Sequence, residues 1–80
     1  MDLKSLETFI QVAELGSFTK ASDRLGFSQP TVSFHIKQLE KELGIQLFDR
    51  VGHTVCLTEG GRKVLIQAQQ ICRLTAQMVD

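Results

Sequence analysis

The sequence predicts a mainly α-helical domain in which three helices are followed by a small β-hairpin and one long C-terminal helix. Three observations lead to this prediction. Apolar residues recur at helical spacing in three segments between residues 3 and 43, and a glycine follows each segment. Between residues 45 and 57, β-branched and aromatic residues instead flank a polar turn. From residue 58 to the end, apolar residues recur every seven positions, as in helices that pair side by side.

The composition is typical of one folded domain with a modest core: 80 residues, 42% hydrophobic and 22% charged. No apolar run is long enough to span a membrane and the N-terminus does not resemble a signal peptide, so we expect a cytoplasmic protein. Cys56 and Cys72 match no metal-ligand spacing and are expected to be ordinary thiols in a reducing compartment. Nine basic residues balance nine acidic ones, which counts against nucleic-acid binding when only the total charge is considered.

The first two helices are short and adjacent. The apolar stripe of the first includes Leu6 and Phe9, and Gly16 is expected to end it. Ser17 then caps a second helix, which ends at Gly26. A tight turn containing glycine joins this helix to the next, which is the helix-turn-helix pattern with its second helix facing outward. A plain helical hairpin within a bundle is the alternative.

The third helix, from Ser28 to Gly44, has both of its ends encoded in the sequence. Ser28 can accept the free N–H of Thr31, and Pro30 lies in the first turn, where a missing N–H costs nothing. Because a residue before proline avoids the α region, Gln29 is an alternative N-cap.

The two faces of this third helix differ in chemistry. One face carries an apolar stripe formed by Val32, Ile36, Leu39 and Leu43. The other face of its first three turns carries hydrogen-bonding groups, one aromatic ring and one lysine: Gln29, Thr31, Ser33, Phe34, His35, Lys37 and Gln38. Amides and hydroxyls at a helix N-terminus match the edges of DNA bases and nearby phosphates. A polar surface without such a role is equally compatible with this helix alone.

The hairpin must pack on the helices, because two strands are not stable alone. Phe48, Val55 and Leu57 are expected to supply the packing side. Arg50 and His53 lie near the tip of the hairpin, and their alternative interpretation is two solvated side chains on a turn.

The last helix begins at Thr58. Gly60 and Gly61 in its first turn each weaken it by about 1 kcal/mol, which predicts a close approach of other backbone, or a joint. Its apolar surface is wide enough to pack on the domain with one side and on a partner helix with the other. The residues predicted to pair are Val64, Leu65, Ala68, Ile71, Cys72, Thr75 and Met78. A helix packed only within its own chain is the alternative.

The sequence contains no phosphate-binding loop, nucleophile motif or metal-ligand cluster, so we expect neither an enzyme nor a cofactor bound to this chain. Several runs of residues do closely resemble the DNA-binding region of LysR-type transcriptional regulators. They are Leu6-Glu7-Thr8-Phe9 with Ala13, Gly16-Ser17-Phe18-Thr19-Lys20-Ala21-Ser22 with Leu25, Ser28-Gln29-Pro30-Thr31-Val32-Ser33 with Ile36, Gln38-Leu39-Glu40, Leu43-Gly44, Leu47-Phe48 with Arg50, and Leu57-Thr58-Glu59 with Gly61.

The resemblance implies a winged helix-turn-helix domain at residues 1–58, with the helix-turn-helix at about 18–37 and the hairpin as the wing. It implies that residues 59–80 form a linker helix through which two copies pair, with a higher oligomer compatible with a full-length protein. A larger domain that senses a small-molecule inducer normally follows in this family and is expected to lie outside this chain.

The resemblance also assigns the implied DNA contacts to the starts of two helices and to the wing. They are Ser17, Phe18, Thr19, Gln29, Pro30, Thr31, Ser33, Phe34, Lys37, Arg50 and His53. Gln29, Pro30 and Thr31 would face bases. Phe34 stands where the family often has a basic residue, and it is expected to touch a thymine methyl group instead. The wing carries only Arg50 and His53, so its contacts with the minor groove are expected to be weak.

We therefore expect a bacterial transcriptional regulator that binds double-stranded DNA as a dimer on an interrupted inverted repeat. The alternative is a winged-helix module that binds protein instead of DNA, and the neutral net charge is its only support.

Overall fold

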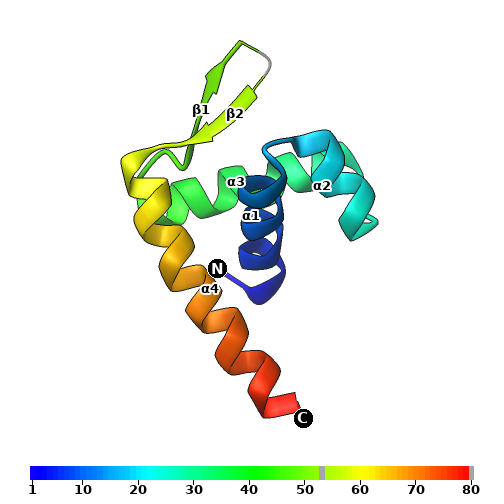
Figure 1. The fold of residues 1–80 in the computed structure, drawn as a ribbon, viewed down its shortest axis with the longest axis vertical. Coiled ribbons are helices and arrows are strands. Elements are labelled where there is room, and N and C mark those ends of the chain that lie inside the picture. Colours follow the sequence, from blue (N-terminus) through cyan, green and yellow to red (C-terminus); the bar gives the residue numbers. More distant parts are fainter. Residues whose placement is uncertain (53, 80) are drawn as a thin grey trace.

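The computed structural model describes residues 1–52 and 54–79. Its elements follow the chain as α1 (Leu3–Leu15), α2 (Phe18–Leu25), α3 (Gln29–Leu43), β1 (Phe48–Val51), β2 (Thr54–Leu57) and α4 (Glu59–Val79). Figure 1 shows α1 to α3 gathered in one body, from which the hairpin and α4 project in different directions. The predicted mainly α fold, a winged helix-turn-helix followed by a long helix, is confirmed.

The first three helices each begin at a capping side chain. The hydroxyl of Ser17 accepts the N–H of Lys20 at 3.1 Å, and that of Ser28 accepts the N–H of Thr31 at 3.3 Å. Ser28 is therefore the cap of α3, and Gln29 is its first helical residue.

The cap of α1, Asp2, went unrecognised in the sequence. Its carboxylate accepts the N–H of Ser5 at 2.8 Å, and this hydrogen bond lowers the pKa of Asp2. Between α2 and α3 the chain turns at Gly26, whose φ of 74° lies in the left-handed region that glycine adopts without strain.

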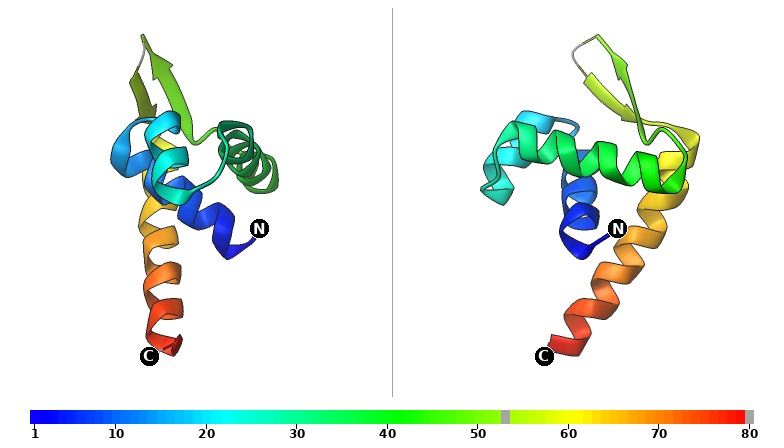
Figure 2. Two further views of the ribbon diagram at one scale, coloured as in Figure 1. Left: turned by 90° about the vertical axis from the view of Figure 1, so that its right-hand side faces the viewer. Right: turned by 180° about the vertical axis from the view of Figure 1, so that it is seen from behind.

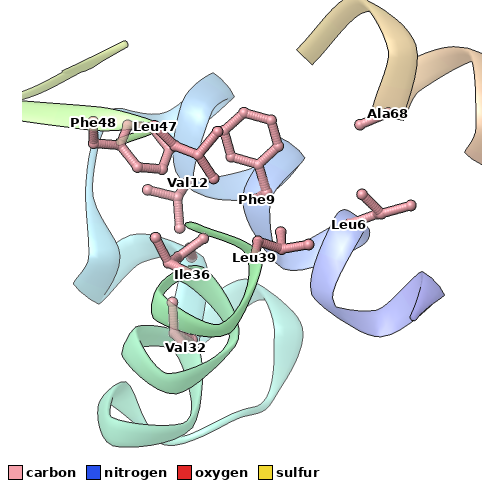
Figure 3. Packing of buried hydrophobic residues seen from close by; sticks show 10 residues of the cluster. Leu6, Phe9, Val12, Val32, Ile36, Leu39, Leu47, Phe48 and Ala68 are labelled. Atoms are coloured by element: carbon pink, nitrogen blue, oxygen red, sulfur yellow. The ribbon is translucent and has the colours of Figure 1, made fainter. Parts of the chain in front are cut away.

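The core lies where α1, α3, the start of the hairpin and α4 meet (Figure 3). Its buried hydrophobic residues are Leu6, Phe9, Val12, Ala21, Val32, Ile36, Leu39, Leu47, Phe48 and Ala68. The rings of Phe9 and Phe48 meet edge to face with their centroids 5.4 Å apart. Edge-to-face geometry is favourable for aromatic pairs. Since Phe9 belongs to α1 and Phe48 to β1, this contact holds the wing against the first helix.

The hairpin pairs β1 with β2 antiparallel, with Phe48 opposite Leu57 and Val51 opposite Thr54. Phe48 is buried, and Val55 and Leu57 pack against the core, which confirms the predicted packing side. The far end of the hairpin projects away from the helices (Figure 2).

Among the described residues, no helix is long and apolar enough to cross a membrane.

The start of α4 runs against the backbone at Leu47. The Leu47 carbonyl accepts the N–H of Thr58 at 3.0 Å, and the hydroxyl of Thr58 accepts the N–H of Gly61 at 2.9 Å. A Cβ at Gly61 would overlap the Leu47 carbonyl oxygen and lie 3.1 Å from its carbon. A Cβ at Gly60 would instead meet the Cδ1 atom of Ile45 at 3.0 Å. The predicted close approach of backbone is thus confirmed at Gly61.

We expect Gly61→Ala to lower the free energy of unfolding by about 1–3 kcal/mol, because the methyl group overlaps backbone that must move. Gly60→Ala is the matched control: it meets only a flexible side-chain end and gains about 1 kcal/mol of helix propensity, so its net change should be small. Urea unfolding followed by circular dichroism measures both. Equal effects of the two substitutions would contradict the role assigned to Gly61.

Candidate nucleic-acid interface

The N-terminal half of α3 presents polar side chains on the side away from the core. Val32 and Ile36 are buried, whereas Gln29, Pro30 and Lys37 are exposed. The same outward surface carries Phe34, which is 61% exposed, and the half-buried Thr31 and Ser33. A benzyl ring with so much exposure makes little contribution to the core, so its position is suited to contact with another molecule.

The start of α2 lies beside the start of α3 (Figure 2). The side-chain amide of Gln29 donates from Nε2 to the Thr19 hydroxyl at 3.1 Å. The hydroxyls of Ser28 and Thr31 are 2.9 Å apart and share a hydrogen bond. The two helix starts therefore form one continuous polar surface, in which Ser17 acts as the N-cap of α2.

The charged side chain of the wing is held against α2. The guanidinium carbon of Arg50 lies 5.4 Å from the centre of the Phe18 ring, a cation–π arrangement. The Phe18 ring in turn meets the edge of Phe48, with 6.0 Å between centroids. Alternation along β1 puts Phe48 and Arg50 on the same face of the strand, toward the helices. Arg50 is thus positioned by an aromatic chain that begins in the core.

A hollow of about 320 Å³ separates α3 from the wing. Lys37 and Arg50 line it together with the hydroxyl-bearing Ser33. Glu40 also lines it, but its carboxylate accepts the N–H of Leu47 at 2.8 Å. Two cations and a hydroxyl are the groups that bind phosphate oxygens, so this hollow suits a nucleic-acid backbone.

His35 does not belong to the outward face to which the sequence pattern assigned it. Its Nδ1 lies 2.8 Å from the hydroxyl of Thr8 on α1, and its ring meets the edge of Phe27 with 5.4 Å between centroids. The Thr8 hydroxyl also donates to the Lys4 carbonyl at 2.9 Å, so it accepts from the Nδ1–H of His35. The helical position of His35 borders the buried stripe, and Thr8 supplies the partner that draws the ring inward.

His53, predicted to contact DNA from the wing, lies outside the described residues. Cys56 and Cys72 are free thiols, and burial raises the pKa of Cys72. Within residues 1–52 and 54–79 no three side chains are arranged to hold a metal ion.

The predicted pairing residues of α4 divide into two groups. Val64, Leu65 and Cys72 pack against the core of their own chain. Ala68 is only 1% exposed and faces Leu6 of α1, so it does not belong to the surface left for a partner (Figure 3). The reason is its spacing from Leu65 and Cys72, which puts all three on the side of the helix that covers α1.

The outer surface of α4 retains an apolar strip that the sequence prediction included only in part. Ile71 and Met78 are 40% and 83% exposed, and Thr75 is half-buried beside them. Leu74, which the prediction omitted, is 61% exposed and completes the strip at three- and four-residue spacing. Contiguous exposed apolar side chains are a common feature of protein–protein contact surfaces.

The family model described as bacterial regulatory helix-turn-helix protein, lysR family, matches residues 3–62. An HTH-type transcriptional regulator in the ibpB-leuC intergenic region of Azotobacter vinelandii is 54% identical over 71 residues, which are 89% of this chain and 49% of that protein. The chain therefore spans about half the length of that relative.

Two solved structures share the fold over nearly the whole chain. A CbnR DNA-binding domain in complex with DNA has a TM-score of 0.94 at 35% identity, covering 100% of this chain and 92% of that one. A BenM DNA-binding domain in complex with benA site 1 DNA has a TM-score of 0.93 at 42% identity, covering 99% and 92%.

Thr8→Val should lower the free energy of unfolding by about 1–3 kcal/mol, because the partly buried N–H of His35 loses its acceptor. Thr54→Val, an exposed substitution on β2, is the control and should change stability by no more than about 0.5 kcal/mol. Chemical denaturation at neutral pH measures both. If the two variants are equally stable, the bond between α1 and α3 contributes nothing.

Proposed function

The chain belongs to the lysR family of bacterial regulatory helix-turn-helix proteins, and from this premise we propose that it binds double-stranded DNA sequence-specifically as part of a transcriptional regulator. The observation that carries the proposal is the uncovered N-terminal half of α3, in a fold shared with two domains whose crystal structures are complexes with DNA. In this proposal α3 enters the major groove, where Gln29, Pro30 and Thr31 face base edges. Phe34 reaches a thymine methyl group from the same helix.

Backbone contacts position the helix in the groove. Ser17, Phe18 and Thr19 lie at the start of α2, where a helix N-terminus favours a phosphate. Ser33, Lys37 and Arg50 line the hollow between α3 and the wing. There they donate hydrogen bonds to the oxygens of a DNA phosphate. The predicted role of His53 in the wing remains a part of the proposal.

The neutral net charge is compatible with this function, because the charges are unevenly distributed. Residues 24–39 contain no acidic side chain but include Arg24 and Lys37. Glu40, the first acid after them, is engaged with the Leu47 N–H. A phosphate approaching the N-terminal half of α3 therefore meets Lys37 before any carboxylate of that helix. Nearby charges dominate such an encounter, because salt screens charges beyond a Debye length of about 8–10 Å.

We further propose that two copies pair through the outer strip of α4, formed by Ile71, Leu74 and Met78, with Thr75 at its border. A twofold dimer of this kind places two copies of α3 in successive major grooves of an interrupted inverted repeat. For the whole regulator, we propose a cytoplasmic location, assembly beyond the dimer, and an inducer bound by a further domain. The relatives are transcriptional regulators, and we propose no enzymatic role.

The direct test is a mobility shift with genomic fragments of the source bacterium in excess nonspecific competitor. A retained fragment supports DNA recognition. If no fragment is retained at micromolar protein, the proposal is wrong and the protein-binding alternative gains support.

Two substitutions on α3 separate base reading from positioning of the helix. Gln29→Ala should lower the preference for the operator over an operator with one changed base pair by about 1–3 kcal/mol, because an amide contact to a base is lost. Lys37→Ala should weaken both duplexes equally and lower the salt slope by about one, because it removes a phosphate contact. Titration of each duplex at two salt concentrations measures these quantities. Equal weakening of both duplexes by Gln29→Ala would remove Gln29 from the specificity contacts.

A substitution on the outer strip of α4 tests the proposed dimer. Leu74→Asp should raise the dimer dissociation constant at least about tenfold, because a carboxylate would be desolvated at the pairing surface. Ala76→Asp is the matched control, since Ala76 is exposed two residues away and thus on the opposite side of α4. Sedimentation velocity across micromolar concentrations distinguishes the species. A monomeric parent chain, or a Leu74→Asp variant that dimerises like its control, would contradict the proposed surface.

A further inference from the structure

The hydrogen bond between Gln29 and Thr19 joins the two helices of the helix-turn-helix at the surface that would face DNA. Gln29 is the first residue of α3, and Thr19 lies in the first turn of α2, ten positions earlier in the chain. Both side chains are exposed, so the bond is not a by-product of core packing. Among the described residues, this is the one hydrogen bond made by either of these two polar side-chain groups.

The bond places the Gln29 amide beside the start of α2. A glutamine amide has a donor end and an acceptor end, and a half-turn about its last torsion exchanges them. With one Nε2–H directed to Thr19, the Oε1 atom and the second N–H remain available. Adenine presents a donor at N6 beside an acceptor at N7, which matches an amide that offers Oε1 and an N–H together, whereas guanine presents two acceptors.

An unanchored glutamine at this position would lose rotamer freedom on binding, which weakens each contact that it makes. Thr19 is well suited to prevent this. Its β-branched side chain has few accessible rotamers, so its hydroxyl occupies a defined place on α2. The anchor is therefore present before any base is met.

We propose that Thr19 is a positioning residue for base recognition: its hydroxyl holds the Gln29 amide in place, with Oε1 and one N–H free to contact an adenine edge. The inference rests on the proposed DNA-binding function and gives Thr19 a role different from the phosphate contact proposed above for the start of α2. The two roles make opposite predictions. A positioning residue changes the discrimination between base pairs, whereas a backbone contact changes the affinity for all sequences alike.

The test uses an operator duplex selected by the parent protein and a second duplex changed at the base pair where Gln29→Ala loses its preference. Thr19→Val removes the hydroxyl and retains the branched shape, and Thr19→Ser retains the hydroxyl. Thr19→Ala is a second hydroxyl-free variant, and thermal unfolding verifies that all variants fold. Binding to both duplexes is titrated at two salt concentrations.

Thr19→Val and Thr19→Ala should lower the affinity ratio between the duplexes about three- to tenfold, at or below the lower end of the range for a lost base contact. Thr19→Ser should restore the ratio to within about twofold of the parent. The double variant Thr19→Val with Gln29→Ala should discriminate no worse than Gln29→Ala alone, because the two residues act as one unit.

An unchanged ratio with equally weakened binding would overturn the inference and identify Thr19 as a backbone contact. Additive losses in the double variant would also overturn it, since Thr19 would then act without Gln29. A parent protein that binds no selected duplex would refute the proposed function, and the inference would fall with it. If the parent protein prefers the selected duplex but the Thr19 variants keep the same preference, only the inference fails and the proposed function stands.

Discussion

The arrangement of this molecule depends on the contacts of one residue, Leu47. Its side chain is fully buried in the core, and its N–H donates to the Glu40 carboxylate near the end of α3. Its carbonyl accepts the N–H of Thr58 and leaves room for no side chain at Gly61. Helix α3, the wing and α4 thus all form hydrogen bonds or close contacts with this one residue. Any partner held by α4 is oriented relative to α3 through this junction.

A second consequence of the fold is that the candidate DNA-binding groups are linked to the core. Phe9, Phe48 and Phe18 form a chain of edge-to-face contacts that ends under the guanidinium of Arg50. Thr8 and His35 join α1 to α3 below the exposed face. Groups fixed in this way lose little conformational freedom when they bind, which preserves affinity in a domain without excess positive charge.

Local patterns in the sequence predicted much of this structure, because caps, stripes and turns depend on neighbouring residues. Ser17 and Ser28 begin helices, and Gly61 meets another backbone, as their positions indicated. The errors involve contacts between distant segments. His35 turns inward to a hydroxyl 27 positions away, and Ala68 is covered by α1. Polar side chains at the border of a stripe take either direction, and periodicity carries no information about which partner the fold supplies.

Because α4 is long, a small change in the angle of its first turn produces a large displacement of its far end. Its 21 residues extend about 30 Å at 1.5 Å per residue. Tilting such a rod by about 5° at its base moves its far end by nearly 3 Å, on the order of a whole hydrogen-bond length. In the reverse direction the lever reduces movement: a displacement of nearly 3 Å at the far end rotates the first turn of α4 by only about 5°. The close packing of Gly61 on the Leu47 backbone therefore fixes the direction in which the far end of α4 lies.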